Sequence, residues 1–214
     1  MTTATKPATD TAGVRFTEEM KGHVEFGESD FERGRNGSTY LMFHLTIGTD
    51  DIEAFVADPS HEAEATGWVG CEDLGGRRPV DRGWFNLFVD TGRPGDKRMR
   101  YRLHFTDGVG HPLTLTGYKV IKHDKGFDLW PDTTTLYTRL LRGHVHEDGD
   151  DSAEIVASGV LRVQKLDFAR QLTTFRGSGS SARRNVGALV KFNVLFADQL
   201  REVYAPWLGK KRSR

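Results

Sequence analysis

Residues 126–137, GFDLWPDTTTLY, gather side chains that could bind a small molecule. The proline after Trp130 disfavours helix, so this segment is an extended approach to a strand. Trp130 and Tyr137 could form an apolar wall, and Asp132 with the threonine hydroxyls could supply the few polar groups that such pockets use. Alternatively, Phe127 and Trp130 form a hydrophobic lid over a barrel end, with Asp132 as a turn former. We interpret the segment first as a lid and second as a pocket rim.

Two alternating segments, residues 39–47 and 82–91, supply a second set of candidates. Each places aromatic, thioether or amide side chains on one face of a strand. If these faces line the interior of a small barrel, they suit a lipid-like or polycyclic ligand, with His44 and Asn86 fixing its orientation. The alternative is a packed core with satisfied hydrogen bonds. The predicted ligand-binding residues are Tyr40, Met42, His44, Trp84, Asn86, Phe88, Trp130, Asp132 and Tyr137.

Other reactive residue types lack the patterns that catalysis or metal binding needs. His144 and His146 project to one side of a strand, but a metal site needs three or four ligands. Cys71 precedes Glu72 and Asp73, whose charges would raise the pKa of its thiol, so it is interpreted as structural. No nucleophile elbow, Walker loop or dinucleotide fingerprint is present. The sequence predicts no metal and no cofactor.

Composition narrows the partners and the compartment. The 214 residues carry 30 basic and 30 acidic side chains, which gives no overall attraction to nucleic acid or an anionic membrane. A single cysteine makes a cytoplasmic location the default expectation. No apolar run is long enough to cross a bilayer. Residues 1–13 are predicted to form a disordered arm and residues 208–214 a solvated basic tail.

Strict alternation of apolar and polar residues is the dominant signal in the chain. Short turns rich in glycine and aspartate separate the alternating segments, as in antiparallel hairpins. The pattern predicts a single mainly β domain over residues 14–207, an antiparallel up-and-down β-barrel or sandwich of about eight strands. The predicted strands are residues 14–26, 39–47, 65–71, 82–91, 97–106, 112–122, 135–144 and 155–166.

Two helices are expected beside the sheet. Residues 51–58, directly after the second strand, form a short helix that ends at Pro59. Residues 181–204 carry apolar side chains at spacings of three and four, which predicts a long amphipathic helix. We expect this helix to pack over the barrel, plugging one end or lying along one wall. Residues 177–181, GSGSS, are interpreted as a flexible connector to it.

Several segments together resemble a known family. They are RFTEEMKGHV, TGWVGCEDLGG, RGWFNLFVDTG, KRMRYRLHFTDGVGHPLTLTGYKVI, GFDLWPDTTTLYTRLLRGHV and LDFARQLTTFRG. Over residues 15–204 the chain resembles an accessory region of large actinobacterial proteins that also carry a glucose-methanol-choline, cholesterol-oxidase-like flavoprotein region and often an α/β-hydrolase region. The resemblance implies an association with steroid, terpenoid or other lipid-like substrates. It implies no catalytic residues, and the flavin and nucleophile motifs of those regions are missing here.

Three functions follow as hypotheses. The first is a module that binds a hydrophobic small molecule and delivers it to a separate oxidoreductase or hydrolase. The second is a cofactor-independent isomerase or cyclase that acts on a polycyclic or polyketide-like substrate, with His44, Asp132 or Tyr137 as the acid-base group. The third is a structural module that docks on a partner through an exposed apolar patch.

Overall fold

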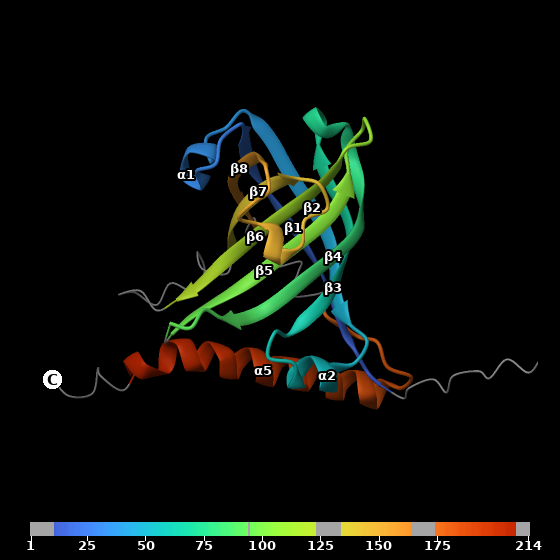
Figure 1. The fold of residues 1–214 in the computed structure, drawn as a ribbon. Helices are drawn as coiled ribbons and strands as arrows, with labels where there is room; N and C mark the ends of the chain where they lie inside the picture. Colours follow the sequence, from blue (N-terminus) through green and yellow to red (C-terminus); the bar gives the residue numbers. More distant parts are fainter. Residues whose placement is uncertain (1–10, 94, 123–133, 164–173, 209–214) are drawn as a thin grey trace, which may run out of the picture.

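The computed structural model describes residues 11–93, 95–122, 134–163 and 174–208, the last five of these by their backbone alone. Eight antiparallel strands follow one another around a barrel, and β1 pairs with both β2 and β8, so the sheet closes (Figure 1). This confirms the predicted up-and-down barrel and decides against a sandwich. The strands are β1 (Val14–Phe26), β2 (Thr39–Thr49), β3 (Glu62–Cys71), β4 (Gly76–Asp90), β5 (Asp96–Thr106), β6 (Pro112–Lys122), β7 (Thr135–Arg142) and β8 (Ile155–Arg162).

The barrel interior is filled by one parity of each strand. In β2 the fully buried side chains are Leu41, Phe43, Leu45 and Ile47. The alternate residues of β2 face outward, because side chains of a pleated strand point to opposite faces in turn. The same rule places Met99, Leu103 and Phe105 of β5 inside, as the alternation predicted.

Four register shifts interrupt the pairing of the described strands. The β3–β4 register shifts between Glu64 and Trp68, and the β4–β5 register shifts between Asn86 and Val89. Within the bulge between Asn86 and Val89, Phe88 has a φ of 54°, which is unusual for a residue with a β-carbon. The bulge rotates Phe88 from the outer wall to a fully buried position.

Short helices, two 3-10 turns and a two-residue strand lie outside the eight barrel strands. The helix α1 (Phe31–Gly34) lies between β1 and β2. The predicted short helix appears as α2 (Ile52–Ala57), capped by the Asp51 carboxylate, which accepts from the amides of Glu53 and Ala54. Two 3-10 turns, η1 (Glu72–Leu74) and η2 (Glu147–Gly149), follow β3 and β7. The two-residue strand β9 (Arg176–Gly177) pairs with the first residues of β1.

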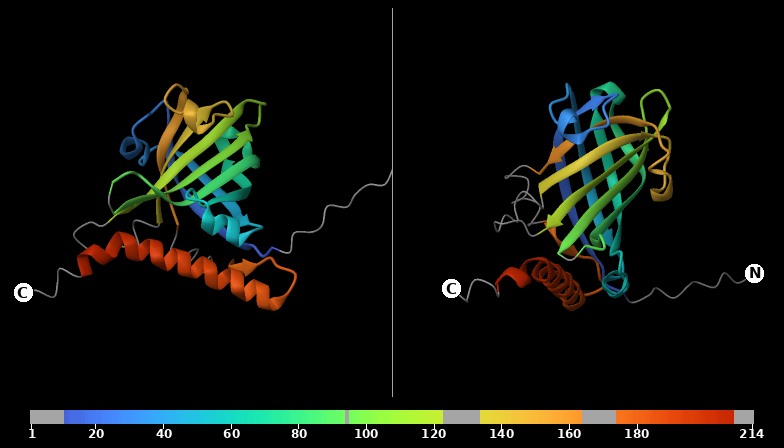
Figure 2. Two further views of the ribbon diagram at one scale, coloured as in Figure 1. Left: turned by 60° about the horizontal axis from the view of Figure 1, so that its bottom comes forward. Right: turned by 60° about the vertical axis from the view of Figure 1, so that its left-hand side comes forward.

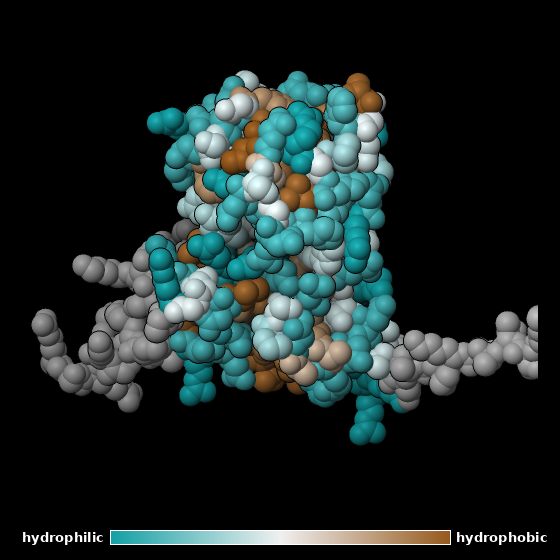
Figure 3. All heavy atoms as spheres, viewed as in Figure 1, coloured by the Kyte–Doolittle hydropathy of each residue, from teal (hydrophilic) through white to brown (hydrophobic). Residues whose placement is uncertain are grey.

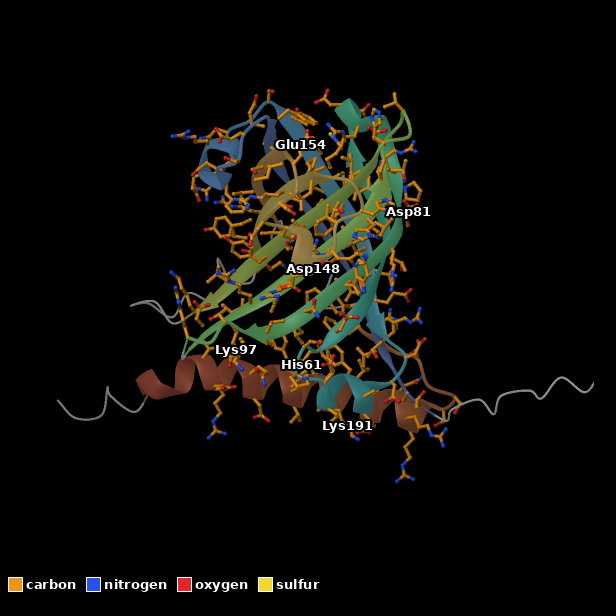
Figure 4. All side chains as sticks on the ribbon, in the orientation of Figure 1. His61, Asp81, Lys97, Asp148, Glu154 and Lys191 are labelled. Carbon is orange, nitrogen blue, oxygen red and sulfur yellow. The ribbon has the colours of Figure 1, made fainter. Side chains whose placement is uncertain are left out.

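The long helix α5 (Ala182–Leu208) lies across one end of the barrel, as Figures 1 and 2 show from three directions. Phe192 packs against Phe16 of β1, with ring centroids 6.3 Å apart, and Phe196 packs against Phe88 at 5.1 Å. Lys97 at the start of β5 lies at this end (Figure 4) and donates to Glu202 of α5 at 2.8 Å. The helix therefore covers an end of the barrel and not a side wall. Within the described residues, no helix has the length and apolarity to span a membrane.

Candidate functional site

Three predicted pocket residues of β2 do not line the interior. Tyr40, Met42 and His44 lie on the outer wall, and Tyr40 is 47 % exposed. The expectation that they face an enclosed ligand space is therefore wrong. Both faces of this segment are partly apolar, and the more apolar parity takes the interior because it buries more hydrocarbon.

Outer-wall neighbours give these residues a different setting. The His44 ring stacks on Trp68 of β3 at 5.9 Å, and the Arg77 guanidinium of β4 lies 3.9 Å from the centroid of the Trp68 ring. Tyr40, Met42, Trp68 and Arg77 line an open hollow of about 170 Å³ together with Gly70, Cys71, Glu72 and Gly76. The face of the barrel that Figure 3 shows is mostly polar, with scattered apolar patches.

The predicted residues of β4 also separate. Trp84 faces outward and packs against His104 at 5.0 Å and His146 at 6.0 Å. The side-chain amide of Asn86 donates to the Ser60 carbonyl at 3.3 Å, again on the outside. Neither lines the interior, which corrects the sequence prediction. Phe88 is buried, but against α5, on account of the bulge.

Of residues 126–137, the structure describes those from Thr134 onward. Trp130 and Asp132 lie outside the described residues. Tyr137, the third residue of β7, lies on the outer wall, where its ring lies 5.7 Å from Phe31 and 5.6 Å from Tyr118. Tyr137 therefore belongs to an outer aromatic cluster and not to the interior.

Three polar residues that the sequence analysis did not single out as functional meet inside the barrel. The Glu18 carboxylate accepts a hydrogen bond from the Tyr101 hydroxyl at 2.6 Å through Oε2. Its Oε1 accepts from the Lys119 ammonium, also at 2.6 Å. The ammonium lies 5.1 Å from the centroid of the Tyr101 ring. We refer to Glu18, Tyr101 and Lys119 as the interior triad.

The interior triad joins opposite walls of the barrel. Glu18 projects from β1, whereas Tyr101 and Lys119 project from β5 and β6, and β5 is four strands away from β1 in either direction. Exposure of the three residues is only 3 %, 2 % and 2 %. The Tyr101 ring contacts the rings of Phe43 and Phe85, with centroids 5.8 and 4.9 Å away. The triad is therefore a charged bridge across an apolar interior.

Burial sets the protonation of the phenol. Removal from water raises the pKa of Tyr101 well above its ordinary value, and the charge of Glu18 and the hydrogen bond to it raise the pKa further. Tyr101 therefore stays a hydrogen-bond donor at every physiological pH. Together with an ammonium donor and a carboxylate acceptor, it gives the interior one place where a polar group could be recognised or a proton transferred.

The α5 end of the interior is tightly closed where it is described. Phe16 is the inward residue of β1 two positions before Glu18. Its ring stacks on Phe175 at 4.8 Å and contacts Phe192. One apolar gap of about 10 Å³ remains between the barrel end, α2 and α5, which is room for about one water molecule. It is lined by Val14, Phe16, Ile47, Gly48, Thr49, Phe55, Ala63, Phe85 and Phe192. A ligand would have to displace part of this aromatic seam.

The histidine pair forms part of an outer cluster. His144 stacks on His104 at 4.9 Å, and His146 lies 5.5 Å from His104. Burial lowers the pKa of His104, and the neighbouring His144, His146 and Arg102 lower it further, against a hydrogen bond to the Val145 carbonyl. Across the described ranges, no three histidine, cysteine or acidic residues are placed to hold a metal ion.

Cys71 is buried and carries no disulfide. Burial is the first cause that raises the pKa of its thiol, and the charges of Asp73 and Glu72 add to it. The structural interpretation of this residue fits the geometry.

A sequence signal for the interior triad does exist. Glu18 falls on the apolar parity of β1, between Phe16 and Met20, and Lys119 falls on the inward parity of β6, two residues before Ile121. A charge on the buried parity of a strand is the mark of a group that needs an internal partner. Sequence alone could not say that β1 faces β5 and β6.

Comparisons with known proteins assign no family to the chain. No protein-family model matches it, and no curated protein or solved structure is significantly similar to it.

Proposed function

We propose that the chain binds a mostly apolar small molecule inside the α5 end of its barrel and holds a polar group of that molecule at the interior triad. The observation that carries the proposal is a hydrogen-bonded charged bridge within a mainly apolar core. The proposal keeps the predicted ligand class and moves the site from the β2 and β4 faces to Glu18, Tyr101 and Lys119.

The energetics of burial support a role beyond folding. Removing a carboxylate and an ammonium from water costs several kcal/mol for each ion, and their attraction often only offsets this cost. An apolar trio of similar volume would fill the same space with little or no loss of stability. Buried groups with perturbed pKa values gather at functional sites, and Tyr101 is such a group.

The environment of the interior triad favours one ligand class. Phe43 and Phe85 flank Tyr101, and apolar side chains occupy the neighbouring inward positions of β1, β5 and β6. A molecule with a hydrocarbon body and one carbonyl or hydroxyl group complements this arrangement. The resemblance to the accessory region of cholesterol-oxidase-like proteins points to the same class, and an oxidoreductase or hydrolase as recipient remains part of the proposal.

A second candidate function is acid-base catalysis at the same place. Tyr101 and Lys119 both donate to Glu18, so a substrate carbonyl that displaced the carboxylate would find two donors, and Glu18 would become free to take a proton. An isomerase or cyclase needs this combination. His44 and Tyr137, proposed from the sequence as acid-base groups, lie on the outer wall and are replaced in this role by the interior triad.

Binding can be tested with a matched pair of tyrosine variants. The full chain is titrated with Nile red, and a sterol, a terpenoid alcohol and a fatty acid are tested as competitors. Tyr101→Phe removes one interior hydroxyl and should weaken binding about fivefold to tenfold, the equivalent of one hydrogen bond. Tyr118→Phe makes the same chemical change on the outer wall and should leave binding unchanged.

Two results would count against the proposal. One is the absence of displacement by all three competitor classes. The other is equal loss of affinity in both variants, which would place the dye on the outer surface. Turnover of a bound competitor, followed by mass spectrometry and lost in Tyr101→Phe, would favour the catalytic candidate.

A further inference from the structure

The helix α5 has an apolar face that the barrel does not use. Its inward face buries Ala188, Phe192 and Val203. On the opposite side Val186, Val190 and Val194 recur every four residues and are 61 %, 55 % and 55 % exposed. We call these three residues the valine stripe. They make up three of the seven large hydrophobic residues that are exposed in the described part of the chain, so the stripe is a concentrated feature and not scattered surface.

Basic residues bracket the valine stripe. Arg183 lies one turn before Val186 and Arg201 two turns after Val194, about 27 Å apart along the helix and on the same side as the valines. Among the described residues neither guanidinium has an acidic partner. Side chains with nitrogen ends extend from α5 away from the barrel (Figure 4).

The acidic groups nearby do not cancel this charge. Lys191 pairs with Glu53 of α2, and Glu202 turns to Lys97 of β5. Asp198 is the remaining acidic residue in the described part of α5. Beyond the helix the sequence adds four more basic residues, Lys210, Lys211, Arg212 and Arg214. The partner of this face must therefore be anionic as well as apolar.

A second copy of the chain does not satisfy this requirement. Antiparallel pairing of two valine stripes would bring Arg183 of one copy beside Arg201 of the other, and parallel pairing would bring each arginine beside itself. Like charges in direct opposition are destabilising. The stripe also lacks the tryptophan and tyrosine anchors that dominate protein interfaces.

We propose that the outer face of α5 docks on an anionic lipid surface. A helix with a shallow apolar stripe and basic residues lies in the plane of a bilayer interface, its apolar side at the acyl boundary and its cations at the headgroups. The docked orientation would place the covered end of the barrel against the bilayer. The valine stripe is distinct from the interior triad, so lipid docking and ligand binding can fail independently.

The test is flotation of the full chain with vesicles. Vesicles of phosphatidylcholine alone are compared with vesicles of equal parts phosphatidylcholine and phosphatidylglycerol, and the wild type should bind only the anionic ones. Val190→Asn with Val194→Asn should reduce partitioning at least about tenfold. Arg183→Gln with Arg201→Gln should reduce it about 25-fold, since each basic residue near the surface contributes about fivefold.

Matched control variants lie at the far end of the barrel. Val109→Asn changes the 80 % exposed valine of the β5–β6 turn, and Arg142→Gln changes an exposed arginine at the end of β7. Both should partition as the wild type does, and circular dichroism should show that all variants melt alike. Equal binding to both vesicle types, or undiminished binding of the double valine variant, would overturn the proposal. So would a reversible dimer in sedimentation velocity that the double valine variant abolishes.

Discussion

Two of the clusters of paired charges in the described residues differ in their surroundings. The interior triad bridges the barrel among apolar side chains. On the outer wall Arg102 makes two hydrogen bonds to the Asp150 carboxylate, at 2.9 and 2.6 Å, and a third to the Val145 carbonyl at 2.8 Å. In each cluster both oxygens of the carboxylate accept a hydrogen bond.

The difference between them is the solvent. On the outer wall, Arg102 holds the loop after β7 against the barrel by hydrogen bonds, and water screens any unpaired charge there. Inside, each member of the interior triad depends on the others, because no water can replace a missing partner. The outer cluster therefore has a sufficient structural explanation, whereas the inner one has an energetic cost that a binding or catalytic role would explain.

The largest expected effect is the loss of one interior charge. Lys119→Met leaves the Glu18 carboxylate buried without its cation and should lower the free energy of unfolding by about 3–5 kcal/mol. The exposed counterpart, Lys191→Met beside Glu53, should cost less than about 1 kcal/mol. Urea unfolding of both variants measures the contrast, and similar losses would mean that burial does not set the energy scale.

A smaller effect is expected from the outer cluster. Arg102→Met removes the paired bonds to Asp150 and the bond to Val145, and should lower the free energy of unfolding by about 1.5–3 kcal/mol. Amide exchange by mass spectrometry should show faster opening of residues 143–154 in this variant, while the exchange of β1 stays the same. Faster exchange in β1 as well would indicate that the two clusters are coupled.

A fall in pH should lower the stability of the fold through His104, whose ring bonds the same Val145 carbonyl as Arg102. Burial and nearby cations lower the pKa of His104 in the folded state, so the unfolded chain binds that proton more readily. Stability should therefore decrease as the pH falls through about 6.5, the ordinary pKa of histidine. Urea midpoints measured above and below this pH should differ less in His104→Gln than in the wild type. Burial also lowers the pKa of His61. The His104→Gln variant should therefore still lose part of its stability at low pH. An unchanged pH dependence in His104→Gln would contradict the role of His104.

The smallest effect belongs to a solvated ion pair. Arg15 contacts Asp50 at 2.6 Å, but both side chains are largely exposed. Arg15→Gln should change the free energy of unfolding by less than about 1 kcal/mol and should lose even that effect at high salt. A salt-independent loss above this value would show that exposed pairs in this barrel behave like buried ones.

The alternation of apolar and polar residues predicted where the strands lie. It did not predict which face of β2 and β4 points into the barrel. Val14–Phe26 and Pro112–Lys122 have the predicted bounds, and no register shift interrupts their pairing with β2 and β5. The strands β3 and β4 begin earlier than predicted, and a bulge in each obscures the pattern. The four-residue helix α1 is too short for a periodic signal.

The predicted inward orientation of the β2 candidates was wrong for a related reason. The outward face of β2, with Tyr40 and His44, has the composition of a pocket, and only closure of the barrel decides which face is enclosed. The interior triad depends on contacts of Glu18 with Tyr101 and Lys119, which are 83 and 101 residues away in the sequence. Local pattern carries no information on such contacts.

The most direct measurement is the replacement of the whole interior triad by apolar residues, Glu18→Leu with Tyr101→Phe and Lys119→Met. If the triad serves a ligand, this variant should unfold within about 2 kcal/mol of the wild type, because no buried charge is left unpaired. Its affinity for the displacing ligand should fall at least tenfold, the equivalent of about 1.4 kcal/mol. A variant that binds normally but has lost most of its stability would show that the interior triad only holds the barrel together.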